Sequence, residues 1–475
     1  MRRILHPFKG LSNAREVWAW GMYDLANQSF TLLITTVFFG IYFKTIVVAD
    51  PSRGEALWGR SFAIASIIVV VLSPMAGALA DHTARKKAWL MGLGAGCVGL
   101  TASLALVGPG DIALGMTLYI AANVCFMLGE NFLGAFLPGI ATRETMGRVS
   151  ATGWTMGYIG AVVCLPLALA LPGVAKGTTA GFHAVFIFAA AWFLLNAIPT
   201  ALYLREHAPA APPAEGPVLL AGFRRLAQTL RDMRRFSALA RFLAVFVVYS
   251  CGVQVIIVFS AVIAKDYLPD QRQLVLFIWA LAAVSGVGSF VTAAVQDRLG
   301  HRRVISAALL VWLATALGAA ALPTIALIFW LLSALGALPP SSGGAPMLAF
   351  WIVGIGVGLG LGTIGSASRA LVGTMTPAHK AAEFFAFWGI AYKLAGAIGP
   401  WVFGEVSASA GRRTALLVVA GFFLLGLIGL WFVDVGKGRR AAEDAEREAG
   451  PGAADLLDAA ADAEVGVVSA DRSGL

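Results

Sequence analysis

The chain has 475 residues, of which 59% are hydrophobic and only 13% are charged, and its mean hydropathy is +0.80. Soluble domains have about 25% charged residues, so this composition excludes a water-soluble globular protein and indicates that a lipid bilayer is the solvent. The formal net charge of +9 is divided among short loops between apolar segments. That distribution argues against a nucleic-acid-binding face and is typical of membrane topology.

Apolar segments follow one another along the chain, and a transmembrane helix needs about 20 such residues. Six segments precede a polar stretch at 205–237 and six follow it. We predict spans at 17–43, 57–80, 88–108, 112–136, 150–172, 181–204, 238–264, 274–296, 303–322, 346–368, 381–406 and 412–435. A shorter apolar segment at 324–338 is either an extension of the ninth span past Pro323 or a re-entrant or interfacial piece.

The basic residues predict which side of the membrane each loop occupies. With a cytoplasmic N-terminus, the loops on the inner side hold most of the lysines and arginines, among which we count Arg369 beside the tenth span. The outer loops hold the smaller set Lys44, Arg53, Arg60, Lys176, Lys265, Arg272, Arg412 and Arg413. Basic residues concentrate on the cytoplasmic side of membrane proteins, so both termini are expected there.

Polar residues inside the spans are candidates for function, because such residues are costly in lipid unless they face a cavity or a partner. Asp24, Asn27 and Gln28 of the first span, followed by Thr31 and Thr35, have the spacing of one helical face. The other candidates for a substrate or proton pathway are Asn123, Glu130, Asn131, Tyr158, Gln254, Tyr392 and Lys393.

These candidates divide by chemistry. Asp24 and Glu130 are acids that could couple transport to protons, and Lys393 could attract a substrate carboxylate or pair with one of them. Structural roles stay open as alternatives: a helix cap for Asp24, an ion pair with a loop arginine for Glu130, and backbone hydrogen bonds for Lys393. Tyr158 and Gln254 could equally be packing residues.

The two sets of six spans carry a repeated loop. "GALADHTARKK" at 77–87 matches "TAAVQDRLGHRR" at 292–303, and a weaker match aligns Trp154 with Trp388. We interpret the chain as two parallel repeats, an architecture of transporters. The loops would close the cytoplasmic side by contacts between the halves, unless their charges only fix topology. The gating candidates are Gly77, Asp81, Arg85, Lys86, Asp297, Arg298, Gly300, Arg302 and Arg303.

The organisation expected is therefore an all-α membrane protein with twelve transmembrane helices in two six-helix bundles, at 1–204 and 238–436. Residues 205–237 form a basic cytoplasmic linker, which is either an amphipathic helix on the membrane surface or a solvated segment. Residues 437–475 are rich in Ala, Gly and acidic residues and are expected to be a disordered cytoplasmic tail.

The motif "DRLGHRR" at 297–303 resembles the loop signature of the major facilitator superfamily (MFS), with His301 in place of the usual basic residue. "WAWGMYDLANQSF" at 18–30, "FLPGIATRETMGRVSATGWTMGYIG" at 136–160 and "EFFAFWGIAYKLAGAIGP" at 383–400 resemble the vacuole effluxer-like branch of that superfamily. This resemblance implies a gradient-driven carrier of small solutes, with amino acids as the leading class.

We therefore expect a secondary active transporter that moves a small polar solute by alternating access, coupled to protons. The alternatives are an exporter of hydrophobic or cationic compounds and a non-transporting receptor or scaffold. We expect no enzymatic activity, cofactor, metal site or nucleic-acid partner, since the histidines lie in loops or at span ends without metal-ligand spacing. The expected partners are a small-molecule substrate, protons and membrane lipids, with a monomer in a bacterial inner (plasma) membrane.

Overall fold

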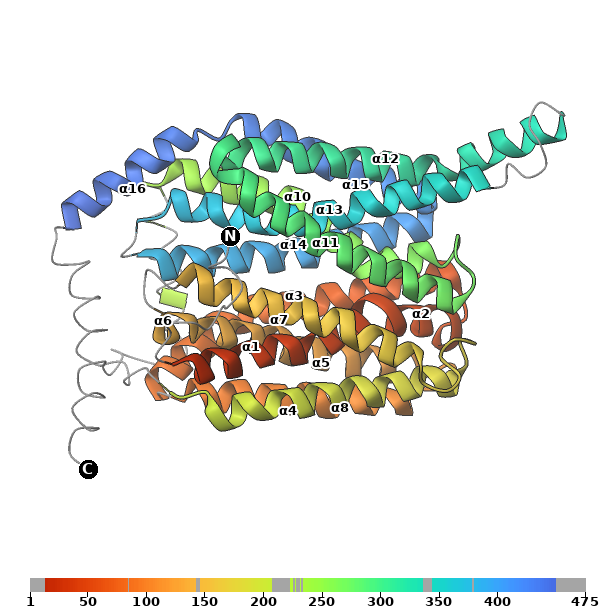
Figure 1. The fold of residues 1–475 in the computed structure, drawn as a ribbon, viewed down its shortest axis with the longest axis horizontal. Coiled ribbons are helices and arrows are strands. Elements are labelled where there is room, and N and C mark those ends of the chain that lie inside the picture. The colour runs from red at the N-terminus through yellow and green to blue at the C-terminus, as the bar shows by residue number, and fades with distance from the viewer. Residues whose placement is uncertain are drawn as a thin grey trace.

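The structure is a computed structural model that describes residues 13–83, 85–141, 146–206, 234–335, 344–377 and 380–449, and four linker residues between 223 and 231. The side chains of a few helical residues, among them Asp81, Asp297 and Arg298, lie outside this description. Throughout the described residues the regular structure is helical (Figure 1).

The helices fall into two sequence groups. The first group is α1 (Ala14–Gln28), α2 (Phe39–Tyr42), α3 (Pro51–Thr83), α4 (Lys86–Ser103), α5 (Ile112–Ala135), α6 (Leu137–Ile140), α7 (Met146–Leu169) and α8 (Thr179–Tyr203). The second group is α10 (Ser237–Ala264), α11 (Gln271–Leu299), α12 (His301–Ala334), α13 (Gly344–Thr374), α14 (Ala381–Ala410), α15 (Arg412–Trp431) and α16 (Val435–Ala449).

Eleven helical segments within the described residues are long and apolar enough to cross a membrane. The long helix α14 is not one of these eleven segments, and it packs along α3. Leucines and isoleucines on the outer faces are exposed, for example Leu195 and Leu202 on α8. Apolar side chains on the outside and backbone hydrogen bonds satisfied within helices are what a lipid solvent requires.

Helix α12 continues through Pro323 to Ala334, so the apolar segment at 324–334 extends the ninth span and is not a separate re-entrant piece. Thirty-four residues at about 1.5 Å each give a helix of about 51 Å, longer than the roughly 30 Å hydrocarbon core. With α13 it reaches beyond the other helices at the end of the molecule where α2 lies (Figure 1). We call this the α2 end, and the opposite one the α16 end.

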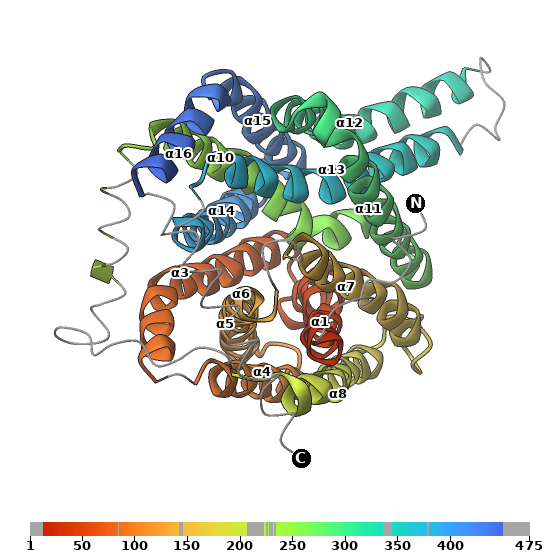
Figure 2. The ribbon, with the colours of Figure 1, turned by 60° about the vertical axis from the view of Figure 1, so that its left-hand side comes forward.

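Viewed along the helices, the two sequence groups lie on opposite sides of the molecule (Figure 2). They meet where α3 packs along α14 and α7 along α11. The α3–α14 contact depends on glycine, because a Cβ added at Gly404 would lie 2.8 Å from the backbone oxygen of Glu55. At the other crossing, Trp279 Nε1 donates a hydrogen bond to the Val162 carbonyl at 3.1 Å.

The first span changes from α-helical to π-helical winding immediately after Gln28. Residues Ser29–Phe38 and Phe43–Val47 are wound as π-helix. π-helical turns are rare and occur often at functional sites. The wider winding changes the direction of each following side chain, so the polar face predicted from Asp24 through Thr35 keeps its α-helical spacing only as far as Gln28.

The C-terminal segment differs from the prediction, because residues 435–449 form α16. Ala, Glu and Arg are strong helix formers. An Arg439–Glu443 pair at i,i+4 and an ion pair between Arg235 and Glu448 hold the helix, and Ala442 and Ala445 are buried. The prediction of disorder is therefore wrong up to Ala449. The rest of the predicted tail, and most of the predicted linker helix, lie outside the described residues.

Candidate functional site

Side chains from both groups of helices form a polar cluster between the bundles. Asn27 of α1 donates a hydrogen bond to the Glu130 carboxylate of α5. Next to Glu130, Asn131 accepts a 2.6 Å hydrogen bond from Lys393 of α14 and donates a 2.8 Å bond to Ser73 of α3. The predicted residues Asn27, Glu130, Asn131 and Lys393 thus lie together, although they come from segments more than 100 residues apart.

Asp24 of α1 and Arg369 of α13 complete the charges of this region. Each is close enough to Glu130, and to the other, for electrostatic interaction. Within the described residues neither side chain makes a hydrogen bond or an ion pair. Asp24 lies against Gly153 of α7, where any Cβ would collide with its carboxylate. We define Asp24, Asn27, Glu130, Asn131, Arg369 and Lys393 as the central polar cluster.

Arg369 is the functional candidate that sequence reasoning missed. Counted with the cytoplasmic loops, it lies instead inside α13, within a segment long and apolar enough to span the membrane. Its guanidinium lies over the rings of Trp154 and Trp388, 5.2 Å from each centroid. Arg369 lies five positions before the end of an apolar helix, where a charged residue often marks the start of a loop. The sequence therefore does not distinguish a loop arginine from an arginine inside the span.

The remaining predicted residues lie on the helices of the cluster or on helices packed against them. Gln28 faces Gly157 of α7, and Gln254 of α10 is buried and donates to the Tyr392 carbonyl at 3.2 Å. Tyr158 lies beside Trp154 and Tyr392 stacks on Trp388, with ring centroids 6.3 and 6.2 Å apart. Asn123 is buried, and in the described part of the chain its Nδ2 has no hydrogen-bond partner.

A pocket of about 80 Å³ opens from Asn131 towards the α16 end of the first bundle. Its lining includes Ser73 and Asn131 at the cluster and Gly77 and Lys86 near the α3–α4 loop. It has room for more than one water molecule, since each takes about 30 Å³ in the liquid. The pocket therefore has Asn131 of the central polar cluster and Lys86, beside the loop that carries the first gating motif, in one lining.

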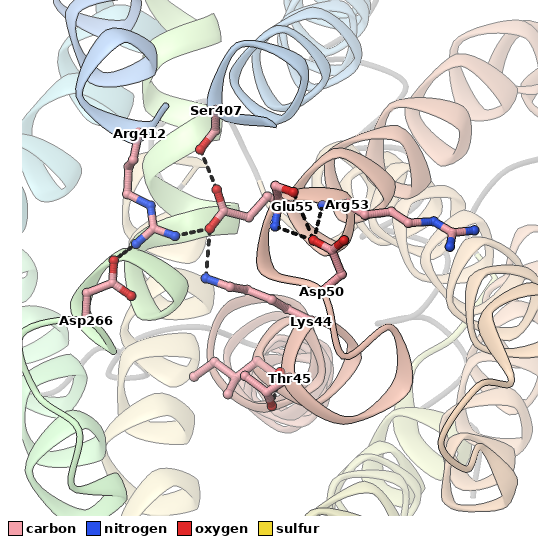
Figure 3. A network of polar contacts seen from close by, with 10 residues as sticks. Lys44, Thr45, Asp50, Arg53, Glu55, Asp266, Ser407 and Arg412 are labelled. Carbon is pink, nitrogen blue, oxygen red and sulfur yellow. Dashed lines mark hydrogen bonds and ion pairs between the residues drawn. The ribbon is translucent and has the colours of Figure 1, made fainter. Parts of the chain in front are cut away.

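A second polar site lies at the α2 end and was not predicted as a unit (Figure 3). Glu55 of α3 is 3% exposed, and its carboxylate contacts three groups: Lys44 at 2.8 Å, Ser407 of α14 and Arg412 of α15. Arg412 also contacts Asp266. We call Lys44, Glu55, Asp266, Ser407 and Arg412 the ionic network. It joins the two groups of helices through one buried carboxylate.

Exposed polar contacts flank this network. Arg60 of α3 pairs with Glu405 of α14, with Nη2 and Oε2 2.9 Å apart. Asp50, exposed before α3, accepts from the backbone N–H of Arg53 and from Ser52 (Figure 3). The N–H of Arg53 and the Ser52 hydroxyl hold the pKa of the Asp50 carboxyl below its usual range, as expected for an acid at a helix N-terminus.

The predicted gating loops are partly described. Arg302 donates to the carbonyls of Trp431 at 3.2 Å and Val433 at 3.4 Å, at the end of α15 in its own group of helices. Gly300 has φ +82°, which lets the chain turn between α11 and α12. Gly77, Arg85 and Arg303 are exposed, and Lys86 lines the pocket. Asp81, Asp297 and Arg298 have side chains outside the described set.

A family model described as "Vacuole effluxer Atg22 like" matches residues 55–443, which include the ionic network except Lys44 and the central polar cluster except Asp24 and Asn27. The chain belongs to this family. The MFS-type transporter YxiO of Bacillus subtilis is 25% identical over 425 residues, which are 87% of this chain and 94% of YxiO. Autophagy-related protein 22-1 of Aspergillus fumigatus is 26% identical over 374 residues, 72% of this chain and 58% of the fungal protein.

Solved structures show the same fold. A D-xylose–proton symporter superimposes with a TM-score of 0.66 over 89% of this chain and 98% of its own, at 13% identity. A bacterial homologue of the human lysosomal transporter Spinster, in an inward-facing unoccupied conformation, gives 0.61 over 91% and 98%, also at 13% identity. This Atg22-like protein is therefore a multi-pass integral membrane transporter of the major facilitator superfamily.

Proposed function

We propose that this Atg22-like transporter is a secondary carrier that moves a small polar solute by alternating access. The observation that carries this proposal is the position of the central polar cluster between two groups of helices that are joined at the α2 end by buried ion pairs. Asp24, Asn27 and Glu130 come from one group, and Arg369 and Lys393 from the other. A solute held between them contacts both halves, which is the arrangement that rocking halves require.

In this proposal α14 also spans the membrane, as the eleventh of twelve spans in chain order. Residues 1–204 and 238–436 are then parallel six-helix bundles joined by the linker. Both termini are cytoplasmic, so the α2 end faces outward and the ionic network closes the outer side. The α16 end carries the loops with the repeated motif, and these close the inner side when the network opens. The contact of Arg302 with the end of α15 would then position the second loop.

Proton coupling is assigned to Glu130 and Asp24. Two carboxylates near one another and near two cations in a low-dielectric region cannot keep the same protonation in every arrangement of the halves. Glu130 interacts electrostatically with Lys393 across the bundle boundary, so movement of α14 changes the environment of Glu130. An amino acid is the leading substrate, because the cluster offers both charge signs to a zwitterion.

The experiment that tests coupling is flux in proteoliposomes with an imposed pH gradient, using amino acids as solutes. Glu130→Gln and Asp24→Asn should abolish accumulation driven by the gradient, and in Glu130→Gln exchange of labelled for unlabelled solute should continue. Asp444→Asn, at an exposed position of α16, is the matched control and should behave as wild type. Accumulation unchanged in both acidic variants would remove Glu130 and Asp24 from the coupling role.

A cationic aromatic compound is the second candidate substrate. It is favoured by the two acids and by Trp154, an aromatic residue that is 54% exposed. A lipophilic aromatic cation such as ethidium, offered to the same proteoliposomes in competition with amino acids, separates the two substrates. Uptake of the cation without any amino-acid flux would favour the exporter.

A further inference from the structure

Arg369 is held by tryptophans on both sides of the boundary between the bundles. Trp154 belongs to α7 and Trp388 to α14, and both ring centroids lie 5.2 Å from the guanidinium carbon. Arginine stacks on aromatic faces through cation–π attraction, which is stronger where water is excluded. The two rings therefore hold the guanidinium at the boundary between the bundles.

The two tryptophans occupy equivalent places in the sequence repeat. The match that aligns Trp154 with Trp388 also aligns Tyr158 with Tyr392, and in each bundle the tyrosine ring lies close to the tryptophan ring. One arginine thus lies between two copies of the same aromatic pair. With the same offset Arg369 aligns with Ala135, so the first repeat unit has no arginine at this place.

The edge of the guanidinium has no partner in the described part of the chain. Its five N–H donors form a planar fork that matches a carboxylate in two parallel hydrogen bonds. Asp24 is near enough to attract Arg369 but does not bond to it, and its own carboxylate is also without a hydrogen bond within the described residues. An anion and a cation without hydrogen bonds in the described residues therefore lie beside neighbouring residues of α7: Asp24 beside Gly153 and Arg369 beside Trp154.

We propose that Arg369, oriented by Trp154 and Trp388, binds the carboxylate of the transported solute, and that Asp24 faces the cationic group of the same solute. This inference rests on the proposed transport function and adds the residues that select the substrate. A zwitterion would bridge the two charges, and its carboxylate would contact a residue stacked on both bundles. Occupancy of the site would thereby be coupled to the relative position of α7 and α14.

The test uses thermal-shift binding on the purified full-length protein with the common L-amino acids, and then with the α-amide of the amino acid that stabilises most. The amide keeps the ammonium and the side chain but loses the negative charge. Wild type should bind the acid about 10- to 100-fold more tightly than the amide, the range of charge-assisted hydrogen bonds. Arg369→Lys keeps the charge but not the fork, and should reduce this ratio severalfold. Arg369→Gln removes the charge as well, and should bring the ratio close to one.

Trp388→Leu gives a second measurement, because loss of one stacking ring should weaken binding of the acid more than binding of the amide. Arg241→Lys, on an exposed position of α10, is the matched control and should keep the wild-type ratio. A wild-type ratio retained by both Arg369→Lys and Trp388→Leu would overturn the assignment of Arg369 alone. Absence of any amino-acid binding and flux in wild type would overturn this inference together with amino-acid transport.

Discussion

The two polar sites between the bundles contain similar residues but are neutralised differently. In the ionic network each charge contacts an opposite charge, and buried Glu55 is shared by Lys44 and Arg412. In the central polar cluster the direct partners are neutral amides: Asn27 for Glu130 and Asn131 for Lys393. Asp24 and Arg369 have no hydrogen-bonding partner among the described residues.

This difference in neutralisation indicates that the two sites have different roles. A buried ion pair that loses one partner is strongly destabilised, so the ionic network suits a contact that stays closed until the whole interface separates. Charges that meet only amides or aromatic rings can accept a proton or a ligand without first breaking an ion pair. We therefore assign closure to the α2 end and solute recognition to the centre.

The largest expected effect comes from Glu55→Gln. This change leaves Lys44 and Arg412 facing one another without the buried carboxylate, and should lower stability by about 3–5 kcal/mol and abolish transport. Melting of the purified protein and flux in proteoliposomes measure the two effects. Glu405→Gln, which breaks the exposed Arg60–Glu405 pair at the same interface, should cost only about 0–1 kcal/mol. Equal losses in the two variants would contradict the distinction between buried and exposed pairs.

A steric change at the same interface should have the next largest effect. Gly404→Val places a branched side chain against the backbone oxygen of Glu55, so α3 and α14 cannot pack closely at the α2 end. Overpacking of this kind costs about 1–3 kcal/mol, and flux should fall at least as strongly as stability. Gly421→Val on α15 has no atom within 4 Å of the added Cβ and is the control. Normal flux in Gly404→Val would show that closure does not need this contact.

In the central polar cluster, Asn131→Leu should separate activity from stability. Lys393 loses its only direct hydrogen-bond acceptor among the described residues but keeps its electrostatic attraction to Glu130. We expect a stability change of about 1 kcal/mol and a roughly tenfold loss of flux. Asn196→Leu on α8, where the amide bonds only within its own helix, is the control. Loss of stability without loss of flux would make this contact structural.

The smallest effect is expected outside both sites, at Asp50. Its folded pKa lies below the unfolded value, so its contribution to stability is present above the unfolded pKa and disappears as the pH falls through the folded pKa. Asp50→Ala should therefore lower the melting temperature slightly near neutral pH. The difference from wild type should vanish in acid. A difference that persists at low pH would mean that Asp50 acts by packing.

The sequence predicts the helices well because membrane spans are set by composition alone. Polar residues within spans also identify Asp24, Glu130 and Lys393, since lipid makes them conspicuous. The pairing of Glu130 with Asn27 and of Lys393 with Asn131 needs the register of helices more than 100 residues apart, which no local pattern contains. Glu55 and Arg412 look like ordinary loop charges for the same reason, and become a unit only when α3 and α15 meet.

In the proposed transport cycle the α2 end opens and closes while the central polar cluster exchanges its solute. Spin labels at positions 53 and 413, exposed residues on opposite sides of the ionic network, can follow it once Cys97, Cys125, Cys164 and Cys251 are replaced. Pulsed dipolar distances should show mainly one short separation in the background protein and a longer population in Glu55→Gln. A single unchanged distance in both proteins would contradict opening and closing at the α2 end.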